Sequence, residues 1–137
     1  MIVADTSALV ALIDADDRHH QALGRLFAAD SNWVLPWAVL PEVDYLLAGH
    51  VGQRAQHAFL GDLADQQFGV EWGVPEDLSR AYELCERYRT LGLGLVDASV
   101  IAVCERLRAS AIATLDLRHF GAVEILGRPR LLPRDLG

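Results

Sequence analysis

The chain has 137 residues, a length that fits one domain and is too short for two, so we predict a single domain over residues 1–137. Its composition, 52% hydrophobic and 23% charged residues, excludes disordered, collagen-like and low-complexity proteins. The net charge of −7 excludes a protein that wraps nucleic acid over its whole surface, although it is compatible with a local basic groove.

Missing residue types exclude several more function classes. All 12 basic residues are arginine, so no Schiff-base, Walker or receiver-domain lysine exists. Cys85 and Cys104 are too few for a disulfide framework, and no C-x-x-C pair offers a structural zinc site. The N-terminal segment has no basic leader, and no apolar run approaches the roughly 18 residues of a membrane span. We therefore expect a cytoplasmic protein with no membrane association.

Short apolar runs alternate with amphipathic segments along the first half of the chain. Apolar runs predict buried strands, and apolar residues three or four positions apart predict helices. Pro41 suits the first turn of a helix, and Gly49 and Gly52 mark a break before the next one. In chain order the pattern predicts a strand at 2–4, a helix at 8–13, a turn at 14–17, a helix ending near 29, a strand at 32–36, a helix at 40–47, a helix around 55–63 and a strand at 68–72.

The second half continues this alternation. Pro75 precedes an amphipathic helix whose stripe of Leu78, Tyr82 and Cys85 is expected to face the core. Together the elements predict an α/β fold with a short parallel sheet flanked by helices. After the Pro75 helix the pattern predicts a loop at 91–95, a helix at 96–107, a strand ending at 116, a last short strand at 123–126 and an irregular tail at 128–137.

Two carboxylates follow apolar strands. Asp5 comes directly after the strand at 2–4, and Asp116 ends the strand that begins near 110. Ligands of open parallel sheets bind beyond the carboxyl ends of the strands, so these two acids are candidates for one site. Aspartate is also a good helix N-cap, and either side chain would then bond the amides of the following turn.

Asp97 lies near the start of a helix and shares a face with apolar residues. Positions i+4 and i+7 are Ile101 and Cys104, so the carboxylate is expected to point along the apolar stripe. A carboxylate turned toward a core costs several kcal/mol unless it is neutralised or hydrogen-bonded. N-capping and a divalent cation both meet this need, and the residues around Asp97 do not choose between them.

Glu42 and Asp44 flank the apolar face of the next candidate helix. Both are also compatible with a solvated flank, and helical phase does not choose between them. Histidine adds no zinc site, because no pair among the five histidines has zinc-binding spacing, and we expect most of them at the surface. Trp33, Trp37 and Trp72 are expected in the core or an interface rather than as platforms for nucleic-acid bases.

Four segments in order resemble the signature blocks of PIN-domain nucleases, and most closely those of VapC-type toxins from bacterial toxin–antitoxin pairs. The resemblance runs from residue 2 to about residue 120 and implies a PIN-like three-layer sandwich with an acidic pocket that holds Mg²⁺ or Mn²⁺. The segments are IVADTSAL at 2–9, VLPEVDYLL at 39–47, LVDASVIAV at 95–103 and ATLDLRHF at 113–120.

The resemblance also implies which residues act. Its catalytic acids correspond to Asp5, Glu42, Asp97 and Asp116, and it selects Glu42 over Asp44. We expect Asp5 and Asp97 to bind the metal directly. The other two acids would hold metal-bound waters or a second, weaker ion.

Further positions follow from the same resemblance. Ser7 and Thr114 correspond to small hydroxyl residues beside the metal, although Thr114 also suits a strand for its β-propensity. Arg118 and His119, which closely follow Asp116, are candidate contacts to a substrate phosphate, with a solvated turn as the alternative. Trp37 and Tyr45 suit a homodimer seam.

The implied activity is hydrolysis of RNA phosphodiester bonds by a toxin that a cognate antitoxin protein inhibits. Carboxylates suit this chemistry because Mg²⁺ prefers oxygen ligands and because four crowded carboxylates repel one another without a cation. The alternative is a catalytically idle module of the same fold that binds a protein or RNA partner.

Overall fold

The computed structural model describes residues 1–136, so Gly137, the end of the predicted domain and tail, lies outside the described residues. Five strands form one parallel sheet in the order β3-β2-β1-β4-β5. The strands are β1 Ile2–Ala4, β2 Trp33–Pro36, β3 Gly69–Glu71, β4 Ala111–Ala113 and β5 Arg130–Leu132.

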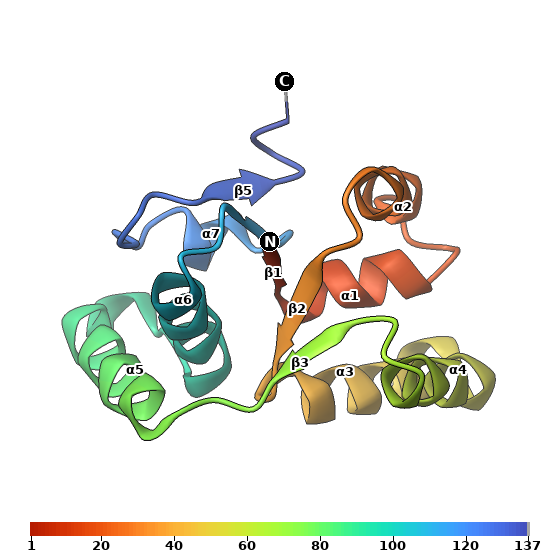
Figure 1. Cartoon of the computed structure of the whole chain (residues 1–137), viewed down its shortest axis with the longest axis horizontal. Helices are drawn as coiled ribbons and strands as arrows, with labels where there is room; N and C mark the ends of the chain where they lie inside the picture. The colour runs from red at the N-terminus through yellow and green to blue at the C-terminus, as the bar shows by residue number, and fades with distance from the viewer. Residues whose placement is uncertain (137) are drawn as a thin grey trace.

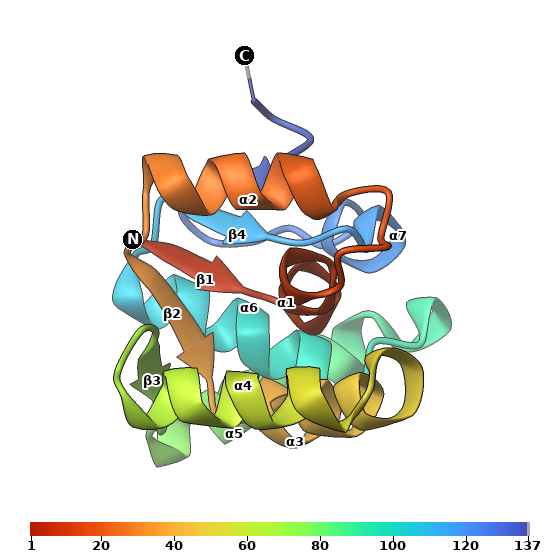
Figure 2. The ribbon, with the colours of Figure 1, turned by 90° about the vertical axis from the view of Figure 1, so that its right-hand side faces the viewer.

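Helices cover both faces of this sheet. Helices α5 and α6 lie on one side of the strands, and α1 to α4 lie on the other (Figures 1 and 2). This arrangement confirms the predicted α/β sandwich. None of the helices formed by residues 1–136 has the length and apolar character needed to cross a membrane. The helices are α1 Thr6–Ile13, α2 His20–Ala29, α3 Val39–Leu46, α4 Gln53–Ala64, α5 Pro75–Arg87, α6 Leu95–Leu107 and α7 Leu117–Phe120, with a π-helix at Leu47–Val51 and a 3₁₀-helix at Arg89–Leu91.

The central strands are buried on both faces. All three residues of β1 and of β4 are buried, which is why these strands read as continuous apolar runs rather than as alternating patterns. Trp33 is buried at the start of β2 and packs edge-on against Phe27, with ring centroids 5.3 Å apart. The expectation that Trp33 belongs to the core is confirmed.

The strand order reverses beside β1. The chain runs from β1 outward to β2 and β3, then returns to place β4 on the other side of β1. In open α/β sheets, ligands bind at the carboxyl ends of the two strands where the order reverses. The ends of β1 and β4 are therefore the expected position of a functional site.

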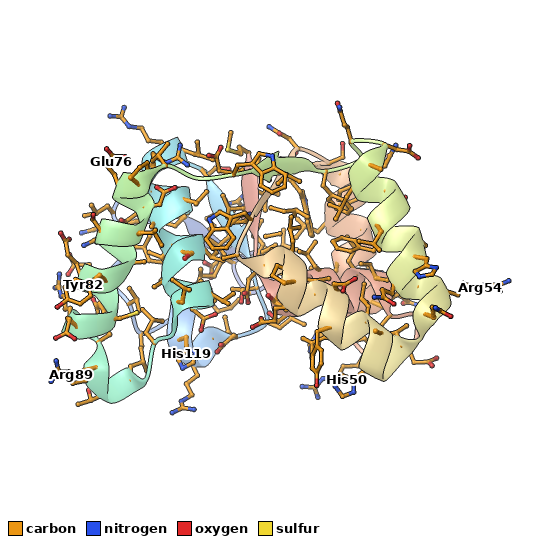
Figure 3. The ribbon with its side chains drawn as sticks, turned by 90° about the horizontal axis from the view of Figure 1, so that it is seen from below. His50, Arg54, Glu76, Tyr82, Arg89 and His119 are labelled. Carbon is orange, nitrogen blue, oxygen red and sulfur yellow. The ribbon has the colours of Figure 1, made fainter. Side chains whose placement is uncertain are left out.

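The predicted buried stripe of α5 is wrong for Leu78 and Tyr82, whereas Cys85 does pack against the core. Leu78 and Tyr82 are 54% and 69% exposed, and Figure 3 shows Tyr82 on the outer side of the helix. The buried face carries Asp77 instead, next to Ala81 and Leu84. Asp77 decides the helix orientation, because its carboxylate accepts a 3.1 Å bond from the Val74 amide and 2.8 and 3.0 Å bonds from the Arg106 guanidinium on α6.

Two predictions near the C-terminus are also wrong. Residues 123–126 form no strand, and the last strand, β5, lies in the segment that was expected to be irregular. The strand forms there because Leu131 and Leu132 are buried against β4, and the Thr114 amide donates to the Leu132 carbonyl at 2.9 Å. Val123 and Ile125 do pack into the core, but from a turn.

Candidate active site

Asp5 lies at the carboxyl end of β1 and is only 3% exposed. Its Oδ2 atom accepts two hydrogen bonds of 2.9 Å, one from the Ser7 hydroxyl and one from the Thr114 hydroxyl. Asp5 precedes α1 but makes no side-chain capping bond to it, so the capping alternative is wrong for this residue. Ser7 and Thr114 instead fix its carboxylate at the strand end.

Burial makes the charge of Asp5 costly. The pKa of this carboxyl is raised from 3.8 to about 6: loss of water contact is the main cause and the nearby charge of Asp97 adds to it, while hydrogen bonds from the Ser7 and Thr114 hydroxyls oppose the rise. A carboxylate in this position is stabilised by a positive charge placed close to it. The surroundings of Asp5 therefore favour a bound cation.

A second cluster joins α6 to the loop after β4. The Nδ1 atom of His119 lies 2.8 Å from Oδ2 of Asp97 and 3.0 Å from Oδ2 of Asp116. Asp116 also accepts a 3.2 Å bond from the His119 amide through Oδ1, so it caps α7 and faces the cluster at the same time. Both alternatives for Asp116, cap and site residue, are thus compatible with its geometry.

The two clusters share one electrostatic environment. The pKa of Asp97 is raised by burial first, and the negative charges of Asp116 and Glu42 raise it further, while His119 lowers it. Asp97 acts in the same way on Asp5. The structure therefore brings all four predicted acids close enough to repel one another through Asp97.

Glu42 and Asp44 differ in their surroundings. Glu42 is exposed in the first turn of α3, and its charge reaches Asp97. Asp44 accepts a 2.9 Å bond from the Gln56 amide on α4 and so joins two helices. The structure supplies the distinction between them that helical phase lacked.

The two predicted hydroxyls connect the clusters. The Ser7 hydroxyl accepts a 2.9 Å bond from the Leu115 amide, and the Thr114 hydroxyl accepts a 3.0 Å bond from the Asp116 amide. Each hydroxyl also donates to Asp5, so both lie beside this acid. Through these hydrogen bonds they connect the Asp5 carboxylate, at the end of β1, to the segment that follows β4.

His119 was predicted only as a candidate phosphate contact beside Arg118, and its contact with the acids was not predicted. It was expected at the surface, yet its side chain is only 20% exposed and contacts two acids. The available signal was its position three residues after Asp116, which places both on one turn of a helix. Arg118 is exposed and forms no salt bridge within the described residues, so its predicted phosphate contact remains a prediction.

The donor atoms fit a divalent cation. One oxygen of Asp97, one oxygen of Asp116 and one ring nitrogen of His119 lie within 4.8 Å of one another. Carboxylate oxygens suit Mg²⁺ and Mn²⁺, and an imidazole nitrogen is better accepted by a transition metal. Asp5 adds a buried carboxylate near the same group.

Residues 2–126 match the sequence profile of the PIN domain. The chain belongs to the PIN-domain family. The resemblance inferred from the four sequence segments is thereby confirmed. This PIN domain is 34% identical over 131 residues to ribonuclease VapC26 of Mycobacterium tuberculosis, across 94% of this chain and 96% of that protein.

Solved structures agree with this assignment. The structure of VapC20 from Mycobacterium tuberculosis, a toxin that cleaves the sarcin-ricin loop, has a TM-score of 0.82 and 26% identity, and covers 93% of this PIN domain and 98% of that chain. VapBC2 of Rickettsia felis bound to promoter DNA has a TM-score of 0.68 and 17% identity, over 96% and 97% of the two chains. FitAcB of Neisseria gonorrhoeae has a TM-score of 0.65 and 13% identity, over 96% of each chain, and like VapBC2 it shows the shared fold alone.

Proposed function

We propose that this PIN domain is a metal-dependent endoribonuclease that hydrolyses RNA phosphodiester bonds. The observation that carries the proposal is the cluster of Asp97, Asp116 and His119, whose donor atoms lie within 4.8 Å of one another, close to the buried Asp5 at the reversal point of the sheet. The identity with ribonuclease VapC26 over nearly the whole chain supports RNA as the substrate. Mg²⁺ is the proposed ion, with Mn²⁺ as a substitute.

Asp5 and Asp97 are the proposed direct ligands. The Ser7 and Thr114 hydroxyls occupy Oδ2 of Asp5, so the orientation of this carboxylate is set before a cation binds. A bound divalent cation would supply positive charge to the scissile phosphate and activate the attacking water. Because the phosphorus is attacked by water, no side chain forms a covalent bond to RNA.

Glu42 and Asp116 are the proposed positioning acids. Glu42 is exposed, so its carboxylate is free to orient water at the edge of the site. Asp116 is held by the His119 amide through Oδ1, which leaves Oδ2 for the cluster. Arg118, on the exposed side of α7, is a proposed contact to a phosphate of the RNA strand.

We further propose that the protein is the cytoplasmic toxin of a toxin–antitoxin pair and a homodimer, and that residues 1–137 form one domain. The likeness to the VapC20 toxin supports the first role, and the proposed protein partner is the cognate antitoxin that the sequence resemblance implies. Tyr45 is 77% exposed and Trp37 is half-buried, and both offer apolar area for a seam between two copies.

The direct experiment is cleavage of short RNAs with Mg²⁺ by the wild-type protein and by Asp97→Asn. We expect wild-type cleavage that a chelator abolishes and a loss of at least about a hundredfold in the variant, since a proposed metal ligand is neutralised. Equal cleavage by both proteins would contradict the mechanism. A wild-type protein that binds RNA or a protein partner without cutting RNA would support the idle-module alternative.

A further inference from the structure

A pocket of about 320 Å³ adjoins the candidate active site. Thr114 belongs to both, because it lines the pocket while its hydroxyl bonds Asp5 at 2.9 Å. The pocket wall comes from the loop before α2, the chain after β4, helix α7 and the turn after β5. Its lining includes Arg18, His19, Thr114, Leu115, Leu117 and Pro133.

Part of this wall is apolar and open to solvent. Leu115 and Pro133 are half-buried, and Leu117 is 41% exposed at the start of α7. An exposed leucine beside two further apolar side chains favours a flat apolar group as the ligand. A nucleobase has this shape and presents polar edges to water.

The rim of the pocket carries the positively charged side chain of Arg18. The Arg18 Nε donates a 3.1 Å bond to Nε2 of His19, and no carboxylate among residues 1–136 forms a salt bridge with Arg18. Arg134, also on the rim, is already paired with Asp135 at 2.7 Å. In a chain of net charge −7, a guanidinium that has no carboxylate partner among the described residues is suited to a phosphate.

We propose that this pocket binds one nucleotide of the RNA strand next to the bond that is cut. The base contacts Leu115, Leu117 and Pro133, and the phosphate contacts Arg18. Continuity with Asp5 through Thr114 favours the substrate strand over a separate protein partner. This inference rests on the proposed ribonuclease activity.

The test measures binding of a short single-stranded RNA by fluorescence anisotropy at several salt concentrations, in the full-length chain carrying Asp97→Asn to prevent cleavage. We expect Arg18→Ala to lower affinity about tenfold and to reduce the slope of log K against log salt by about 0.7, since one phosphate contact is lost. Leu117→Ala should lower affinity about threefold through the base contact alone, with the salt slope unchanged. Arg18→Lys should retain the slope because it retains the charge.

Arg54→Ala is the matched control, because Arg54 is an exposed arginine that Figure 3 shows on a different part of the molecule from His119. Its affinity should stay within about twofold of the parent, since it removes a charge away from the pocket. RNA binding by Arg18→Ala and Leu117→Ala that matches Arg54→Ala would overturn the proposal, even if the wild-type protein cuts RNA. The proposal would also be overturned if the two variants weakened the binding of a protein partner but not the binding of RNA. If RNA binding falls as expected but the wild-type protein does not cut RNA, the pocket stands and the ribonuclease proposal fails.

Discussion

At the residue scale, the site contains buried and half-buried carboxylates whose negative charges are unfavourable in the metal-free protein. Asp5 is held at the end of β1 by two hydroxyls, and burial raises its pKa to about 6. Asp97, whose pKa is also raised, adds to the repulsion. Such an arrangement lowers the stability of the metal-free protein and strengthens its attraction for a cation. Active sites commonly reduce the stability of a fold in this way.

The raised pKa of Asp5 predicts a pH-dependent cost. Because the folded pKa lies above the unfolded value of 3.8, the folded carboxyl binds more protons between these values, and its contribution to stability falls as pH rises through this window. The difference between the folded and unfolded pKa values of Asp5 corresponds to a loss of at most about 3 kcal/mol of stability at pH 7.5. In urea unfolding with a chelator, Asp5→Asn should gain stability relative to wild type by about 2 kcal/mol more at pH 7.5 than at pH 4. If the difference in unfolding free energy between Asp5→Asn and wild type did not change with pH, Asp5 would have an ordinary pKa in the folded protein.

His119 joins Asp97 to Asp116, so its loss should loosen both carboxylates. We expect His119→Ala to lower Mn²⁺ affinity, measured by calorimetry, about 10- to 100-fold, as for other residues that orient metal ligands. His119→Asn should recover part of the affinity, because its amide reaches the position of Nδ1. His50→Ala is the control, since His50 is exposed on the π-helix, and it should bind Mn²⁺ like wild type.

Sequence reasoning placed individual acids well where one local rule applied. Strand ends predicted Asp5 and Asp116, and helical phase predicted the inward direction of Asp97. Glu42 needed the family resemblance, because its proximity to Asp97 depends on how α3 packs against distant parts of the chain. The contact of His119 with Asp97 and Asp116 was not predicted, because the four-residue helix that carries His119 has no periodic pattern.

At the element scale, polar contacts determine the orientation of α5, which the apolar pattern did not predict correctly. Periodicity predicted that α5 exists, but the buried bonds of Asp77 with Arg106 turn the helix so that Leu84 faces the core. In the same way β5 forms where β4 offers a free edge, which no local pattern in the tail announces. Pairing across the sheet is information that a short segment does not contain.

Two leucines on α5 test this orientation with the same substitution. Leu84 is fully buried and Leu78 is 54% exposed. Leu84→Ala should lower the free energy of unfolding by about 2–5 kcal/mol, and Leu78→Ala by less than about 1 kcal/mol, because only the first leaves a cavity. Denaturant unfolding of both variants measures the difference, and equal losses would restore the stripe predicted from periodicity.

At the scale of the whole molecule, the fold assembles the site from distant parts of the chain. Asp5 follows β1, Asp116 follows β4, and Asp97 and Glu42 come from helices on opposite faces of the sheet (Figures 1 and 2). The alternation of strands and helices was enough to predict a parallel sheet with a site at the strand ends. The strand order, which makes β1 and β4 neighbours, came only from the structure.

The central claim is that Asp5, Glu42, Asp97 and Asp116 form one cation-binding site, and a titration of unfolding free energy with Mn²⁺ tests it most directly. Wild type should gain about 2.7 kcal/mol at a hundredfold excess over its dissociation constant. Asp97→Asn should lose nearly all of this gain, whereas Asp44→Asn, which alters the neighbouring acid bound to Gln56, should keep it. A wild-type protein that Mn²⁺ leaves unchanged, or an Asp97→Asn protein stabilised as much as wild type, would contradict the account.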